Sequence, residues 1–139
     1  MAAVNGGRVE LQLSVPATAD NVPLLRHAMA GFLEGQSVIG ETAADVLLAV
    51  TEACTNVVQH AYRSDPAAVD RHIELAAECV DSILEVAVRD LGRGFAPRVD
   101  SPGLGLGLPV IAALTRTVEI RPLTPHGTEV LMTFAIDAG

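Results

Sequence analysis

The stretch ILEVAVRDLGRGFAPRVDSPGLGLG, residues 83–107, decides the fold, because a strand pattern gives way within it to a glycine-rich loop. Apolar and polar residues alternate over residues 83–89, as in a half-buried strand, and Asp90 follows directly. The loop leads into residues 108–114, which predict a short helix. Five glycines mark the loop: Gly92, Gly94, Gly103, Gly105 and Gly107.

Hydrophobic periodicity predicts the elements on both sides of this loop. Apolar residues recur at helical spacing in two segments after the first predicted strand, which covers residues 8–15. The first helix is capped by Thr18 or Asp20 and ends at Gly35, and the second covers about residues 41–62. Period-two alternation predicts the strands, which cover residues 8–15, 72–80, 83–89, 117–121 and 128–136. The second and third strands form a hairpin that turns at Asp81-Ser82, after a loop over residues 63–71.

This order of elements predicts one α+β domain over residues 1–139, with its core between about residues 8 and 136. Consecutive hairpins favour a mixed, mostly antiparallel sheet, and the helices can cover one face of it, which gives a two-layer α/β sandwich. The chain is 50% hydrophobic but only 3% aromatic, so the core must come from aliphatic side chains.

The charge balance excludes several classes of function. The formal net charge is -8, and so few cations cannot build the cationic surface that a nucleic acid requires. All nine cations are arginines, which excludes mechanisms built on a lysine, including P-loop NTPases, the ordinary protein-kinase fold and Schiff-base enzymes.

Cysteine usage and the amino terminus indicate where the protein works. Cys54 and Cys79 lie in apolar patterns without the close spacing of a metal or redox motif, and they predict buried thiols in a reducing cytosol. The first ten residues lack the pattern of a signal peptide, and no apolar run reaches membrane-spanning length. We therefore expect a cytoplasmic protein with no membrane partner.

A polar stripe runs along the second predicted helix. Glu52, Asn56 and His60 are spaced four residues apart, so they project from one helical face, while the apolar residues fall on the other. A carboxylate and an amide placed in this way can share a divalent ion or its water. Taken alone, the stripe is more typical of the solvated side of an amphipathic helix.

The residues after the predicted strand could bind a flat ligand. Asp90-Leu91-Gly92-Arg93-Gly94 places an acid at a sheet edge, followed by two glycines that allow close approach of backbone. Such a carboxylate can accept a hydrogen bond from an exocyclic amine such as that of adenine; a tight turn is the simpler interpretation. Gly127-Thr128 starts the last predicted strand. The Thr128 hydroxyl could join a polar network near the base. Alternatively, Gly127 only forms the turn into the strand, and Thr128 is there because threonine favours strands.

The second glycine run, Gly103-x-Gly-x-Gly, opens a helix whose free N–H groups can cradle a phosphate. A Rossmann site does not fit, because no strand directly precedes these glycines and no βαβ unit surrounds them.

In their order along the chain, these motifs resemble those of a known family. The polar stripe, Asp90-x-Gly-x-Gly-Phe, the second glycine run and Gly127-Thr128 look like the N, G1 and G2 boxes and the closing Gly-Thr of the Bergerat-fold ATPases (GHKL, histidine-kinase-like). Within that superfamily the chain most resembles the anti-sigma-factor serine/threonine kinases, over about residues 9–136.

The resemblance implies an ATP and Mg²⁺ site between helices and sheet. It assigns Glu52 to the acidic residue that activates the attacking hydroxyl, and Asn56 to the magnesium ligand. Asp90 matches the acid that reads adenine, with Gly92 and Gly94 beside the base and Thr128 near it. The phosphate loop corresponds to Gly103, Leu104, Gly105, Leu106 and Gly107.

The family phosphorylates a serine or threonine on a small antagonist protein and sequesters a sigma factor, which makes it a transcription regulator; relatives form homodimers. Two alternatives stay open. One is a non-catalytic sequestering module, favoured by a short lid segment and by Pro102 and Leu104, where the family often has glycine and arginine. The other is the catalytic part of a histidine kinase, which would need a phosphoacceptor helix that the sequence before Arg8 does not supply.

Overall fold

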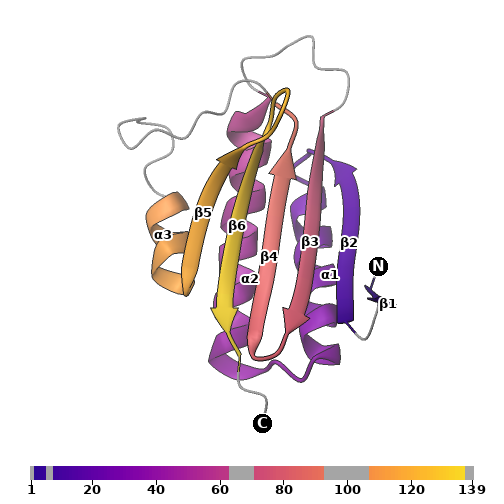
Figure 1. The fold of residues 1–139 in the computed structure, drawn as a ribbon. Coiled ribbons are helices and arrows are strands. Elements are labelled where there is room, and N and C mark those ends of the chain that lie inside the picture. Colours follow the sequence, from indigo (N-terminus) through magenta and orange to yellow (C-terminus); the bar gives the residue numbers. More distant parts are fainter. Residues whose placement is uncertain (1, 6–7, 63–70, 93–106, 137–139) are drawn as a thin grey trace.

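The structure, a computed structural model, describes residues 2–5, 8–62, 71–92 and 107–136. Its strands form one six-stranded sheet in the order β1-β2-β3-β4-β6-β5, and its helices lie on one face of that sheet (Figure 1). The elements are β1 (Ala2–Asn5), β2 (Arg8–Pro16), α1 (Asn21–Gly35), α2 (Gly40–Asn56), the π-helical turn η1 (Val57–Ala61), β3 (His72–Val80), β4 (Ile83–Asp90), α3 (Gly107–Leu114), β5 (Thr117–Pro122) and β6 (Thr128–Ala135).

The predicted two-layer α+β sandwich is confirmed, and each described strand pair is antiparallel. The hairpin turns at Asp81-Ser82 as predicted, with Asp81 at a φ of 56°. The short edge strand β1 was not predicted. The predicted loop over residues 63–71 lies outside the described residues except for Arg71.

Two local predictions about helices need correction. Asp20 is the N-cap of α1 but makes no side-chain cap hydrogen bond; the carbonyl oxygen of Thr18 instead accepts the Asn21 N–H at 3.0 Å. The second helix is not α-helical to residue 62, because the backbone changes to a π-helical turn directly after Asn56. None of the described helices is long and apolar enough to cross a membrane.

Strand and helix periodicity together build the core between the two layers. Alternate residues of β4, Leu84, Val86 and Val88, are fully buried against the helices. The predicted apolar arc of the second helix is buried along its whole length: Val46, Val50, Ala53, Val57 and Ala61. Full burial of one large aliphatic side chain contributes about 1.5–3 kcal/mol. This packing fixes how α2 and η1 sit on β4, and therefore where the polar stripe of α2 lies.

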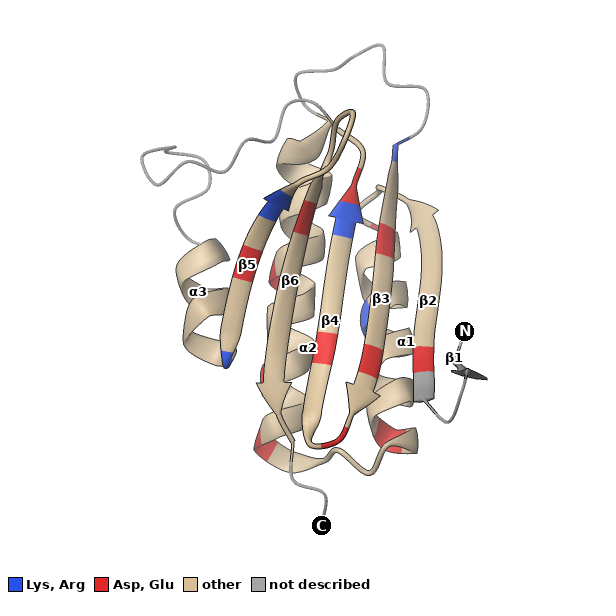
Figure 2. Cartoon of the chain, in the orientation of Figure 1, with Lys and Arg blue, Asp and Glu red and all other residues tan. Residues whose placement is uncertain are grey.

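The other face of the sheet is not covered by any described helix and carries a row of alternating charges across adjacent strands. Glu74, Arg89, Glu129 and Arg121 are successive partners in the registers of β3, β4, β6 and β5. Figure 2 shows this row near the upper end of the sheet. The Arg89 Nε atom donates to Glu129 Oε2 at 2.6 Å, and Arg121 lies 3.7 Å from Glu129 Oε1. These contacts fix the register of β4 and β6 one residue from Asp90.

Candidate functional site

The candidate site is built where β4 ends and β6 begins. Asp90, the last residue of β4, lies directly opposite Thr128, the first residue of β6. Each is 3% exposed. Asp90 shares the helix-facing side of β4 with Val86 and Val88, because strand side chains alternate between faces. The structure therefore places a carboxylate and a hydroxyl opposite each other where β4 ends and β6 begins.

The environment of Asp90 makes its carboxylate a strong candidate for ligand binding. Burial raises the pKa of this carboxyl to about 6, and the hydrogen bond from the Gly92 N–H to Oδ1, at 2.9 Å, offsets part of that rise. Among the described residues, no other hydrogen bond reaches this carboxyl. A buried acceptor without a full set of donors favours a ligand that brings its own N–H group.

Two glycines allow backbone to close around Asp90. A Cβ atom at Gly92 would lie 2.0 Å from the Ala61 carbonyl oxygen, so only glycine lets the end of β4 pack against η1. A Cβ at Gly127, whose φ is 119°, would lie 2.3 Å from the Asp90 carbonyl oxygen. Backbone of η1 and β4 therefore packs directly against the chain on both sides of Asp90, and this packing requires glycine at both positions.

Tyr62 connects three elements at the same end of the sheet, although the sequence pattern marks it only as the end of a helix. Its hydroxyl donates to the His72 carbonyl oxygen at 2.7 Å and accepts the backbone N–H groups of His72 and Leu91, each at 3.1 Å. The signal that could have revealed it is modest: it is the single tyrosine of the chain, and it ends the helix that carries the polar stripe.

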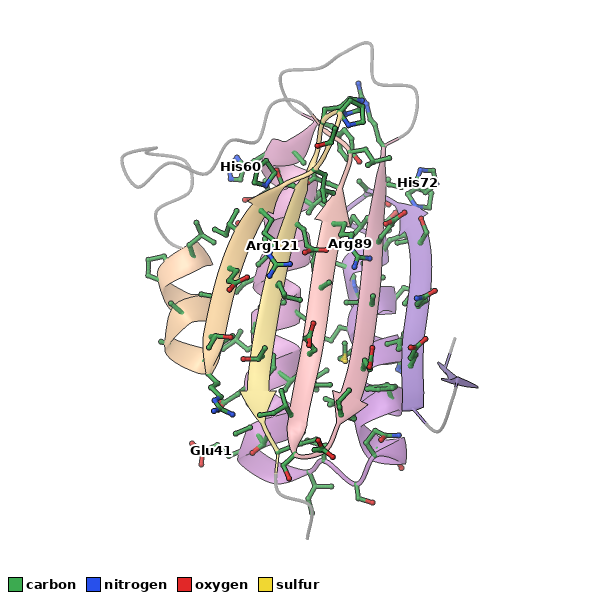
Figure 3. All side chains as sticks on the ribbon, in the orientation of Figure 1. Glu41, His60, His72, Arg89 and Arg121 are labelled. Atoms are coloured by element: carbon green, nitrogen blue, oxygen red, sulfur yellow. The ribbon has the colours of Figure 1, made fainter. Side chains whose placement is uncertain are left out.

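The polar stripe reaches the site along the neighbouring helix. Glu52, Asn56 and His60 are half-buried, and Asn56 is the last residue of α2. The π-helical turn that follows ends at Ala61, which contacts Gly92, so the stripe runs toward the end of the sheet that carries Asp90. Figure 3 places His60 at this end and Glu41 at the opposite end of the molecule. Single π-helical turns are rare and often occur at functional sites.

Most of the predicted phosphate loop lies outside the described residues. Those positions are Gly103, Leu104, Gly105 and Leu106, and Gly94, which was predicted beside the base, also lies outside the described residues. Gly107 is described and begins α3, which packs against α2. Figure 1 shows that the first turn of α3 lies at the upper end of that helix, the end to which β4 also runs. A phosphate at this helix terminus would meet free N–H groups.

The two cysteines differ in their surroundings. Cys54 is fully buried, and burial raises the pKa of its thiol to about 12. Cys79 is only half-buried, so the prediction of a buried thiol is wrong there; burial and the neighbouring Glu78 both raise its pKa. Both thiols are free. Within the described part of the chain, no group of three or more His, Cys, Asp or Glu residues could hold a metal ion.

Comparison with known proteins relates this geometry to a family. The family model described as the histidine kinase-like ATPase domain matches residues 15–134. The chain is 30% identical, over 89% of its length and 83% of theirs, to the serine-protein kinases RsbW of Bacillus thuringiensis (strain Al Hakam) and Bacillus mycoides (strain KBAB4).

A solved structure is similar in fold. It contains the RsbU and RsbW domains of Rv1364c from Mycobacterium tuberculosis, with a TM-score of 0.68 and 23% identity over 91% of this chain. This chain covers 32% of that longer one. At this level of identity the likeness concerns the fold, a two-layer α+β sandwich.

Proposed function

Since this chain belongs to the histidine kinase-like ATPase family, we propose that it is an ATP-dependent serine/threonine protein kinase of the anti-sigma-factor type. In this proposal it phosphorylates a small antagonist protein and sequesters a sigma factor when that antagonist is not available. The observation that carries the proposal is the buried Asp90 opposite Thr128, enclosed by two glycines where a side chain would not fit. The name of the RsbW relatives, serine-protein kinase, supports the reaction.

The residues at the end of β4 fit the base of ATP. The Asp90 carboxylate would accept a hydrogen bond from the exocyclic amine of adenine, and the Thr128 hydroxyl would lie beside the same group. The planar ring would lie against the backbone near Gly92, where the chain has no side chain. The cluster therefore suits a purine that bears an amine.

The phosphates would lie toward the helices. Asn56 would supply a side-chain oxygen to Mg²⁺, an ion that prefers oxygen ligands and retains water. The glycines at 103 and 105 and the first turn of α3 at Gly107 would offer backbone N–H groups. Since the chain has no lysine, charge neutralisation would rest on the ion and the helix terminus.

Phosphoryl transfer needs a group that accepts the proton of the attacking hydroxyl. Glu52 is one helical turn before Asn56 and half-buried, so its carboxylate would take the proton from a serine or threonine of the antagonist. Bound ATP supplies the phosphoryl group and leaves as ADP. The strong negative charge of the chain suits association with a basic segment of a sigma factor, because complementary charge speeds encounter.

Calorimetric titration with ATP, with and without Mg²⁺, tests the binding part of this proposal. Wild-type binding that is lost in Asp90→Asn, and that loses its Mg²⁺ dependence in Asn56→Ala, is expected. If the wild-type protein binds no ATP, the kinase proposal fails.

Transfer is tested with labelled ATP and anti-sigma-factor antagonists encoded in the same genome, each beside a variant without its acceptor serine. Glu52→Ala should bind ATP and lose transfer. Glu41→Ala is the matched control, because Glu41 is an exposed acid in the first turn of the same helix. Equal transfer by wild type and Glu52→Ala would remove the role given to Glu52.

A further inference from the structure

The backbone of Leu91, the residue directly after Asp90, is held at both its N–H and its carbonyl group by side chains. Its N–H donates to the Tyr62 hydroxyl at 3.1 Å, and its carbonyl oxygen accepts from the Nδ1 atom of His126. Tyr62 follows η1, and His126 lies in the turn between β5 and β6. Two parts of the chain that are distant in sequence therefore meet at the backbone of one residue.

The Tyr62 hydroxyl is fully used. It has one proton to donate and two lone pairs to accept with, and the three bonds to His72 and Leu91 match this capacity. The residue is 7% exposed, so water competes little for these bonds. The hydroxyl thus joins the start of β3 to the end of β4, at the place where η1 ends.

The held peptide lies inside the ring that orients Asp90. The Gly92 N–H, two residues after Asp90, donates to the Asp90 Oδ1 atom, so the Leu91 peptide is part of the chain that this hydrogen bond closes. A displacement of the Leu91 N–H would change the direction of Gly92 and, through it, that of the Asp90 carboxylate. The position of the acid therefore depends on a hydroxyl that does not touch it.

We propose that Tyr62 is a positioning residue for nucleotide recognition, because its hydroxyl holds the Leu91 peptide and so aims the Asp90 carboxylate at the exocyclic amine of the base. The inference rests on the proposed function and adds to it the residue that sets selectivity at the base. Tyr62 acts on base recognition, while Glu52 acts on transfer and Asn56 on the binding of Mg²⁺. Its loss should change nucleotide preference and affinity but leave the transfer rate at saturating ATP unchanged.

The test is Tyr62→Phe, which keeps the ring and removes only the hydroxyl. The dissociation constants of ATP and of inosine triphosphate, which lacks the exocyclic amine, are measured for wild type and variant. The wild type should prefer ATP. In Tyr62→Phe the affinity for ATP should fall about tenfold, because one buried hydrogen bond to the base is misdirected. The affinity for inosine triphosphate should stay the same. An unchanged ratio of the two constants would overturn the positioning role.

A control separates this role from a general loss of stability. Leu84→Val removes a methylene group in the core at the other end of β4, about 20 Å from Asp90 at the usual rise of a strand. It should lower the free energy of unfolding and leave the ratio of the two constants at the wild-type value. A ratio that falls in Leu84→Val as it does in Tyr62→Phe would show that stability alone sets the preference, which contradicts the inference.

A second measurement does not depend on nucleotide binding. The titration midpoint of the Asp90 carboxyl, followed by carbon-13 NMR, should shift in Tyr62→Phe, because release of Leu91 changes both the access of water to the acid and the hydrogen bond from Gly92. If the wild type binds neither nucleotide, the proposed function fails, and this titration still decides whether Tyr62 positions Asp90. A midpoint identical in wild type and variant would contradict it.

Discussion

Asp90 and Thr128 face each other across β4 and β6, and Gly127, which precedes Thr128, packs against the Asp90 backbone at a distance that no side chain allows. The pairing of two strands thus places a carboxylate beside a hydroxyl. On the open face, the next pair in the same register is Arg89 with Glu129, an ion pair that stabilises the same alignment. The site therefore depends on strand register as well as on the identity of its residues.

Gly127→Ala should damage both the fold and the site. The residue has a φ of 119°, and an added Cβ would lie 2.3 Å from the Asp90 carbonyl oxygen, so either the turn or the end of β4 must move. We expect a loss of about 1–3 kcal/mol in the free energy of unfolding, from strain at a left-handed backbone position. Urea unfolding measures it, and ATP affinity should fall in the same variant.

Gly31→Ala is the matched control for this substitution. Gly31 lies inside α1, is exposed, and has nothing within 4 Å of an added Cβ. Alanine there should raise the free energy of unfolding by about 0.5–1 kcal/mol, because glycine is the poorer helix former. If Gly127→Ala were as stable as the wild type, the close approach to Asp90 would not be a real constraint.

Asp90 should make the stability of the free protein depend on pH. The pKa of its carboxyl is about 6 in the folded chain against an ordinary value of 3.8, so the folded state binds the proton more tightly. The contribution of this group to stability is therefore present at low pH and is lost as pH rises from 3.8 to 6. Above that window, ionisation of the buried acid costs on the order of 1–3 kcal/mol.

Asp90→Asn isolates this effect from the other acids. Asparagine keeps an oxygen that can accept the Gly92 N–H but carries no charge. The variant should be more stable than the wild type at pH 7.5 and equally stable near pH 4, as measured by urea unfolding at each pH. It should also lose ATP binding, so the gain in stability would come with a loss of function. A variant less stable than the wild type at every pH would refute this assignment.

The sequence predicted the elements around the site because their patterns are strictly local. Alternation fixed β4 and β6 to within a residue, and Asp90 was identified because an acid followed by two glycines came directly after a strand. The edge strand β1 was missed because Ala2–Asn5 shows no alternation. The π-helical turn was missed because the spacing of apolar residues over one turn differs little between α and π geometry.

Tyr62 could not be predicted because its role depends on distant pairings. Its hydroxyl bonds to residues 10 and 29 positions further along the chain, and no periodicity reveals such contacts. The same holds for Gly92 and Gly127. Glycine is required at these positions because the backbone of η1 and of β4 lies where a side chain would be. Local patterns identified the candidate side chains, while the groups that hold them in place became visible only in the three-dimensional arrangement.

The two cysteines should react at different rates with a thiol reagent. Cys54 is fully buried with a pKa raised to about 12, so it should not react in the folded protein. Cys79 is half-buried in β3 and should react slowly. Ellman titration is expected to count one thiol in native protein and two in urea, and Cys79→Ala should abolish the native signal. Rapid labelling of Cys54 would contradict the packing of α2 on the sheet.

The ion pair between Arg89 and Glu129 should matter more than the exposed pair beside it. The Glu129 side chain is 11% exposed and receives Arg89 at 2.6 Å, so Arg89→Met would leave a poorly hydrated carboxylate with only the more distant Arg121. We expect a loss of about 1–3 kcal/mol in the free energy of unfolding.

Glu119→Gln is the control, because the ion pair of Glu119 with Arg121 is exposed to water and should contribute little. Because Arg89 precedes Asp90, ATP affinity should fall in Arg89→Met and stay unchanged in Glu119→Gln. Equal effects of the two substitutions would mean that the row of charges on the open face does not hold the site in register.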